Sequence, residues 1–139
     1  MMKQIMRMAA VLALAVVVSG CGSVSYQDGT YTAQSSPDED GDYGVVNLTI
    51  TNGVVSDCEF LTYEWNGTFK GEEYGMEGGV IANQDYYNKA QNAVAAVKQY
   101  AKQYAETGDL KQVDAVSGAT ISYNQFLEAV DIALDAAKE

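Results

Sequence analysis

The stretch Val45-Val46-Asn47-Leu48-Thr49-Ile50-Thr51-Asn52-Gly53 decides the fold of this 139-residue chain. Its first part alternates between apolar and polar residues, and alternate side chains of an extended strand point to the same side. That spacing places Val46, Leu48 and Ile50 on one face. Asn-Gly is the preferred pair for a tight hairpin turn, because both central residues of that turn need positive φ. We therefore predict an antiparallel hairpin at the centre of a small sheet.

Two further strands are expected next to this turn. The return strand of the hairpin begins at Val54 and ends near Trp65, and alternation puts Val54, Cys58 and Phe60 on one of its faces. Upstream, residues 28–33 predict a turn followed by a strand, because they pass from Asp-Gly into residues with high β propensity.

Two helices are predicted in the second half of the chain. The first begins near Asn83 or Asp85 and ends at Gly108, a typical helix stop. Its apolar residues recur at helical spacing: Tyr87, Ala90, Val94, Val97, Ala101 and Tyr104. The second is predicted to open with Ser122-Tyr123-Asn124-Gln125, a capping box in which Gln follows a hydroxyl by three positions. Its apolar stripe consists of Phe126, Val130, Ala133, Leu134 and Ala137.

Lys111–Val116 lies between the helices, is short and partly apolar, and suits another strand. The segment 66–84 is rich in Gly, aromatic and acidic residues and predicts no regular element. The fold class that follows is α+β, a small antiparallel sheet built on a central hairpin with a long helix and a C-terminal helix packed against it. One domain is expected, over residues 28–139.

The first 20 residues have the features of a lipoprotein signal peptide. Lys3 and Arg7 form a basic start, an apolar run follows, and Val18-Ser19-Gly20-Cys21 resembles the lipoprotein processing box. The apolar run is too short for a permanent membrane span. We expect cleavage before Cys21, lipid attachment to that residue and a tether over 21–27, which would hold the domain at the cell membrane on its extracytoplasmic side.

Composition excludes several function classes. The chain has 19 acidic and 8 basic residues and no His, and its formal charge of −11 becomes −13 when Lys3 and Arg7 leave with the signal peptide. So acidic a surface argues against nucleic-acid binding. The lack of His removes the usual general base and the commonest metal ligand. Carboxylates at Glu72, Glu73 and Glu77 are more simply explained as solvated, so no metal site is expected.

The segment Asp114-Ala115-Val116-Ser117-Gly118-Ala119-Thr120 carries the strongest functional signal. Three small residues in a row suggest unusual backbone angles or a close approach by another group. Thr120 is expected just before a helix N-terminus, where free N–H groups and the helix dipole favour a phosphate. That property matters because no Arg is left once the signal peptide is removed.

The pattern Asp-x-x-Ser-Gly-Ala-Thr resembles the modification motif of the FMN-binding domain family. This family includes the flavin-carrying subunits of sodium-pumping quinone reductases and small bacterial flavin-carrying lipoproteins. The resemblance implies that a flavin transferase moves FMN from FAD onto the Thr120 hydroxyl, leaving a phosphodiester. It also implies that Asp114, Ser117, Gly118 and Ala119 form the recognition sequence.

The function that this resemblance implies is electron transport. FMN on Thr120 would accept electrons from a membrane dehydrogenase or another quinone-linked donor and pass them outward. The protein itself would be an electron carrier rather than an enzyme, because nothing in its side chains equips it for catalysis. Aromatic residues that can stack on the flavin ring are Trp65, Phe69, Tyr74 and Tyr123.

Three alternatives stay open from the sequence. The same fold can hold FMN or another small ligand reversibly, without an ester bond. A structural or adhesive surface lipoprotein can carry the motif as a relic, and the motif can be an ordinary turn before a helix. Cys58 is the only cysteine besides Cys21, and we expect it to be a buried strand residue without a redox or metal role.

Overall fold

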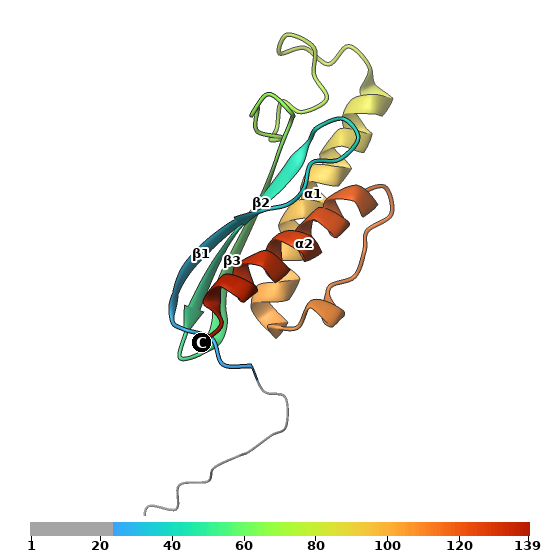
Figure 1. The fold of residues 1–139 in the computed structure, drawn as a ribbon. Coiled ribbons are helices and arrows are strands. Elements are labelled where there is room, and N and C mark those ends of the chain that lie inside the picture. Colours follow the sequence, from blue (N-terminus) through green and yellow to red (C-terminus); the bar gives the residue numbers. More distant parts are fainter. Residues whose placement is uncertain (1–23) are drawn as a thin grey trace, which may run out of the picture.

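A computed structural model describes residues 24–139, and the predicted signal peptide and Cys21 lie outside this range. The strands are β1 (Gly29–Gln34), β2 (Tyr43–Thr51) and β3 (Val54–Tyr63). The helices are α1 (Gln84–Thr107), the short 3₁₀ helix η1 (Leu110–Gln112) and α2 (Thr120–Ala137). A sheet of three antiparallel strands with two long helices confirms the predicted α+β fold (Figure 1).

The predicted hairpin forms the centre and one edge of the sheet. The strand order is β1-β2-β3, and Leu48 of β2 pairs with Cys58 of β3. The turn residues Asn52 and Gly53 adopt φ of 55° and 77°, as a turn of this kind requires. The sequence pattern therefore predicted the hairpin and its turn correctly.

The prediction that Val54 shares a face of β3 with Cys58 and Phe60 is wrong. Thr49 pairs with Asp57 and Ile50 with Val55, so Ser56 bulges out of the pairing and reverses the alternation. As a result Val54 is 63% exposed and Val55 packs against the core instead. Beyond the bulge, alternation holds, and Cys58 and Phe60 are buried as expected.

Both helices cover the same face of the sheet, which gives the domain two layers (Figure 1). Helix α1 lies along β3, while α2 packs on β1 and β2. The core between the layers contains Leu48 and Phe60 from the sheet, Tyr100 from α1 and Phe126 from α2. The rings of Phe60 and Phe126 lie 5.0 Å apart between centroids, so aromatic packing joins the sheet to α2.

Helix α1 begins and ends where its sequence predicts. The side chain of Asn83 accepts a hydrogen bond from the Tyr86 N–H at 3.0 Å, and Gly108 closes the helix with φ 65°. Of the predicted apolar stripe, Tyr87 is only half-buried. The stripe also missed Ala96 and Tyr100, which are fully buried because the helix touches both β3 and α2 and so buries a wider face.

The segment before α2 is not the strand predicted over Lys111–Val116. It contains η1 and then runs extended without a pairing strand. Its backbone groups bond to side chains instead: the Asp114 N–H donates to Gln103 Oε1 at 3.1 Å, and the Val113 carbonyl accepts from the Tyr123 hydroxyl at 3.0 Å. A strand needs a partner ladder, and here side chains of both helices satisfy the backbone.

The predicted capping box at Ser122 is also wrong. Helix α2 already begins at Thr120, after Ala119, and no side chain caps it. Gln125 does not reach back to the backbone of its own helix but is buried and donates to the Asp42 carbonyl at 2.8 Å. No helix in the described part of the chain is both long and apolar enough to cross a membrane.

Candidate functional site

The motif Asp114–Thr120 ends in a tight turn that leads directly into α2. The Ala119 N–H donates to the Val116 carbonyl at 3.0 Å across this turn. Gly118 has φ 84°, a conformation that residues with a side chain seldom adopt. A Cβ at Gly118 would meet nothing within 4 Å, so the backbone angle rather than space requires glycine here.

A buried tyrosine holds this turn from behind. The Tyr100 hydroxyl accepts from the Val116 N–H at 2.9 Å and donates to the Ala119 carbonyl at 3.1 Å. The ring of Tyr100 is fully buried and lies 5.4 Å from that of Tyr123 in an edge-to-face arrangement. Helix α1 therefore positions the turn through the Tyr100 side chain, in addition to the hydrogen bond that Gln103 accepts from the Asp114 N–H.

Thr120 is the first residue of α2 and is exposed. The first helical N–H with a backbone partner is that of Tyr123, which donates to the Ala119 carbonyl at 3.0 Å. The N–H groups of Thr120, Ile121 and Ser122 have no hydrogen-bond partner among the described residues. Three free donors at the positive end of a helix dipole suit an anionic group such as phosphate.

A cleft of about 350 Å³ opens beside this helix end. Of the predicted site residues, Gly118, Ala119 and Thr120 line it, whereas Asp114 and Ser117 do not and lie exposed on the outer side of the turn. The opposite wall comes from the loop 38–42, the end of β3 and the middle of α1. Three of the five predicted site residues therefore line the cleft, and two do not.

The sequence did not predict an ion pair in this cleft. Lys70 Nζ lies 2.5 Å from Asp42 Oδ2, and the two side chains are 14% and 16% exposed. Burial acts to lower the pKa of Lys70, but the hydrogen bond to Asp42 and the electrostatic effects of Tyr74 and Asp42 outweigh it, so the pKa is raised. No local pattern signals this pair, because 28 positions separate its members.

Only one of the four predicted aromatic residues lies on the cleft. Tyr74 lines it, with Lys70 Nζ 4.7 Å from the centre of its ring. Trp65 is 73% exposed and Phe69 is half exposed, outside the cleft wall. Tyr123 belongs to the core packing behind the motif.

The other candidate residues form no metal site in the described part of the chain. Within residues 24–139, no three carboxylate or thiol side chains are close enough to bind a metal ion, and this includes Glu72, Glu73 and Glu77. Cys58 is buried and free, as predicted. Burial, reinforced by Asp57 and Glu59, raises the pKa of its thiol to about 12, so it stays protonated at neutral pH.

Comparison with known proteins supports the family resemblance. The model of the family described as FMN-binding domain matches residues 41–135, which include the motif and the cleft. A crystal structure of a protein from Clostridium perfringens is similar in fold, with a TM-score of 0.61 and 20% identity over 81% of this chain and 88% of that one. A solution structure from Clostridium thermocellum matches with a TM-score of 0.45 and 22% identity, over 79% and 91% of the two chains. No curated protein matches.

Because the family model covers more than half of the sequence, this chain belongs to the FMN-binding domain family.

Proposed function

We propose that this protein is an exported, lipid-anchored electron carrier with FMN esterified to Thr120. The observation that carries this proposal is the position of Thr120, whose exposed hydroxyl stands at the first turn of α2 on the rim of a cleft. A phosphodiester at this hydroxyl would keep its charged oxygens close to three unpaired N–H groups.

The cleft has features that suit the rest of the cofactor. Its volume of about 350 Å³ falls in the usual range for small-molecule sites. Tyr74 offers a ring face, and Lys70 offers the only positive charge among the lining residues. Gln125 and Thr62 add polar groups at its base, and both are buried. These residues would bind and orient the flavin, which supplies the redox chemistry that the side chains lack.

Attachment requires a second protein, a flavin transferase. The Thr120 oxygen would attack the phosphorus on the FMN side of FAD, the bond between the two phosphates would break, AMP would leave, and the hydroxyl proton would go to base. Asp114 and Ser117 are exposed on the outer side of the turn and are accessible to such an enzyme. Their exposure supports a role in recognition rather than in holding the cofactor.

We infer the anchoring and the partners from the sequence. Lipid on Cys21 would hold the domain at the extracytoplasmic face of the cell membrane, where a membrane dehydrogenase or another quinone-linked donor would supply electrons. The tether 21–27 would leave the domain 28–139 in water. The carrier would need no catalytic residue of its own.

Co-expression with a flavin transferase in an exporting host tests the attachment. We expect the denatured wild-type protein to carry one FMN per chain, on the peptide that contains Thr120, by intact mass and by fluorescence. Thr120→Ala should fold normally and lack flavin, whereas Thr120→Ser should keep it because the hydroxyl remains. Flavin that survives denaturation in the Ala variant would disprove the assignment.

Reversible FMN binding is the second candidate, because the cleft exists whether or not an ester forms. It predicts that flavin copurifies with the native protein and is released by denaturant. An unmodified and colourless protein, with a transferase that modifies a control acceptor, would favour the structural lipoprotein instead.

A further inference from the structure

The two ends of helix α2 lie at opposite ends of the domain. Thr120 is its first residue, while its last residue, Ala137, accepts a hydrogen bond from the Gln27 N–H at 2.8 Å. Just beyond the helix, Glu139 Oε2 accepts one from Ser25 Oγ at 2.8 Å. The 18 residues of the helix span about 27 Å at the usual rise per residue. The chain therefore enters at the end of the domain opposite Thr120 (Figure 1).

Exposed apolar side chains gather at the Thr120 end. Of the nine large hydrophobic residues that are exposed in the described part of the chain, six come from the segments around the cleft and the loop above it: Trp65, Phe69, Val80, Ile81, Tyr86 and Ile121. Exposed apolar groups in one region, surrounded by polar ones, are typical of an interaction surface. The other three are Val24 and Val54 at the opposite end and Ile132 in the second half of α2.

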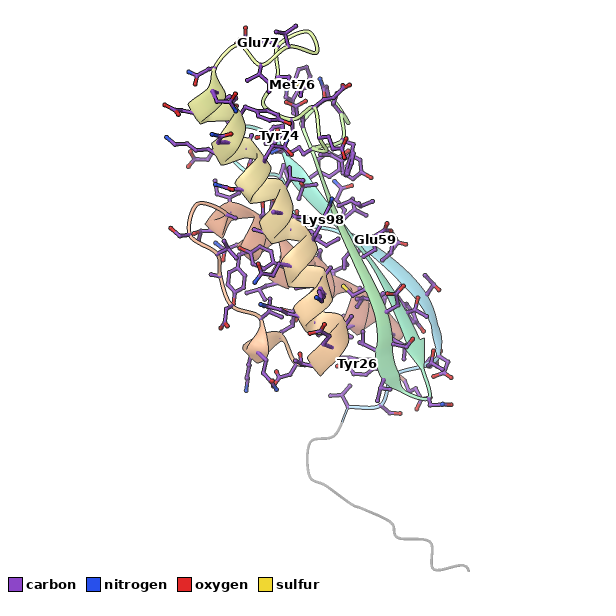
Figure 2. The ribbon with its side chains drawn as sticks, turned by 180° about the vertical axis from the view of Figure 1, so that it is seen from behind. Tyr26, Glu59, Tyr74, Met76, Glu77 and Lys98 are labelled. Carbon is purple, nitrogen blue, oxygen red and sulfur yellow. The ribbon has the colours of Figure 1, made fainter. Side chains whose placement is uncertain are left out.

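The loop 64–79 contains a hollow of about 310 Å³ within this surface. Its lining residues include the acidic Glu64 and Glu73 and the aromatic Phe69 and Tyr74. Tyr74 also lines the cleft that Thr120 lines, so the two cavities share this residue. Figure 2 shows Tyr74 and Met76 on this loop, at the end of the molecule remote from Tyr26. A group bound in the hollow would lie directly beside the cleft.

The hollow is held in shape by α1. Gln91 Nε2 donates to the Gly71 carbonyl at 3.0 Å and to the Tyr74 carbonyl at 2.9 Å. Gly75 passes so close to the helix that a Cβ there would lie 2.7 Å from the Ala90 Cβ. A cavity whose backbone is fixed in this way is preformed for a ligand.

The negative charge at the Thr120 end of the domain favours a positively charged partner. Residues 38–42 and 64–85 contain Asp38, Glu39, Asp40, Asp42, Glu64, Glu72, Glu73, Glu77 and Asp85. Lys70 is the only basic residue in these segments, and it is already paired with Asp42. The carboxylates of Glu64 and Glu73 form no hydrogen bond or ion pair within the described chain, so they are free to bind a cation. A hollow lined by two acidic and two aromatic residues is suited to a Lys or Arg side chain.

We propose that the hollow of loop 64–79 binds a basic side chain of a protein electron-transfer partner, and so docks that partner next to the flavin cleft. This inference rests on the proposed function and adds the chemistry of the partner to it. Opposite charges on the two proteins would accelerate their encounter, as in other transient complexes. Small interfaces suit electron-transfer partners, because these partners must dissociate after each transfer.

Binding of a basic haem protein, cytochrome c, to the protein without its leader tests the docking surface. The double variant Glu64→Gln/Glu73→Gln should weaken this binding about tenfold at low ionic strength, in isothermal titration calorimetry. The matched control Asp57→Asn/Asp131→Asn removes the same charge from exposed positions outside the hollow and should change the affinity by less than about threefold. Equal losses from the two variants, or no binding by the wild type, would overturn the proposal.

The same experiment separates this proposal from the flavin assignment. Binding is also measured with the same charge variants made in Thr120→Ala protein, which has no acceptor hydroxyl, so the docking result does not depend on cofactor attachment. If cytochrome c binding needs Glu64 and Glu73 but the wild-type mass shows no FMN, docking stands and the proposed function fails. If FMN is attached and both charge variants bind alike, the proposed function stands and docking fails.

Discussion

The hydroxyl of Tyr100 donates to the carbonyl oxygen of Ala119, the residue that precedes Thr120, over 3.1 Å. It also accepts the Val116 N–H at 2.9 Å, so one buried side chain of α1 fixes both ends of the turn before α2. This contact ties the long helix to the motif across 19 positions of sequence. It explains how a loop with small side chains holds a defined shape.

Tyr100→Phe should therefore lower the free energy of unfolding by about 1–3 kcal/mol, the usual cost of leaving a part-buried polar group unpaired. Urea denaturation measures this change. Tyr86→Phe is the matched control, since the Tyr86 hydroxyl is exposed and donates to no described residue, and it should leave stability unchanged. Equal stability of the two variants would mean that the turn does not depend on Tyr100.

Gly118→Ala should cost about 1–2 kcal/mol of stability, because its φ of 84° is unfavourable for a residue with a Cβ. Gly79→Ala is a matched control with φ 77° and equally open surroundings, outside the motif and not among the residues that line the cleft. Both variants should lose similar stability, but only Gly118→Ala should slow flavin attachment by the transferase. Equal attachment rates would show that the turn conformation is not what the transferase needs.

The buried thiol of Cys58 makes stability fall in alkaline solution. Its pKa is raised from 9.0 to about 12 in the folded protein, so the unfolded chain loses this proton first as pH rises. The contribution of Cys58 is fully present below pH 9 and is lost between pH 9 and about 12, with a slope of up to about 1.4 kcal/mol per pH unit. Cys58→Ala should show a shallower slope in urea titrations over this range.

Alkylation by iodoacetamide gives an independent measurement of the same thiol. Native protein at pH 8 should react slowly and unfolded protein rapidly, because the thiolate is rare and the sulfur is buried in the fold. Rapid labelling of the native protein, or identical slopes for the wild type and Cys58→Ala, would contradict this prediction.

The charges in the cleft should set the potential of the attached flavin below that of free FMN. Asp38, Asp40 and Asp42 line the cleft with Lys70 as the single positive group, so added negative charge is disfavoured. Each close pair is worth about 1 kcal/mol in water-like surroundings, or on the order of 20 mV for a two-electron couple. A redox titration of the wild type showing an equal or higher potential would contradict this expectation.

The two members of the part-buried ion pair Lys70–Asp42 give opposite tests of that idea. Lys70→Met removes the positive charge and should lower the flavin potential further, whereas Asp42→Asn leaves Lys70 unpaired and should raise it. Asp42→Asn keeps an oxygen that can accept the Trp65 N–H, a hydrogen bond of 3.0 Å in the structure. Shifts of the same sign in the two variants would show that local charge does not control the potential.

The elements predicted best from sequence depend on local rules. The Asn52-Gly53 turn and the stop of α1 at Gly108 each depend on residues within a few positions of one another, and both were predicted correctly. The start of α1 was expected near Asn83 or Asp85, and Asn83 is its N-cap. The errors occur where distant contacts compete with local ones. Ser122 and Gln125 match a capping box, yet Gln125 bonds to Asp42 in another loop and α2 begins at Thr120.

The sequence by itself determined the α+β class, the hairpin, the long helix, the family and the motif that ends at Thr120, because each of these is encoded by spacing along a short segment. The tertiary structure alone decided that Lys70 pairs with Asp42, that Tyr100 supports the turn, and that Tyr74 rather than Trp65, Phe69 or Tyr123 lies on the cleft. These contacts join residues that are far apart in the chain. Their geometry depends on how both helices pack on one face of the sheet, and local sequence patterns do not specify that packing.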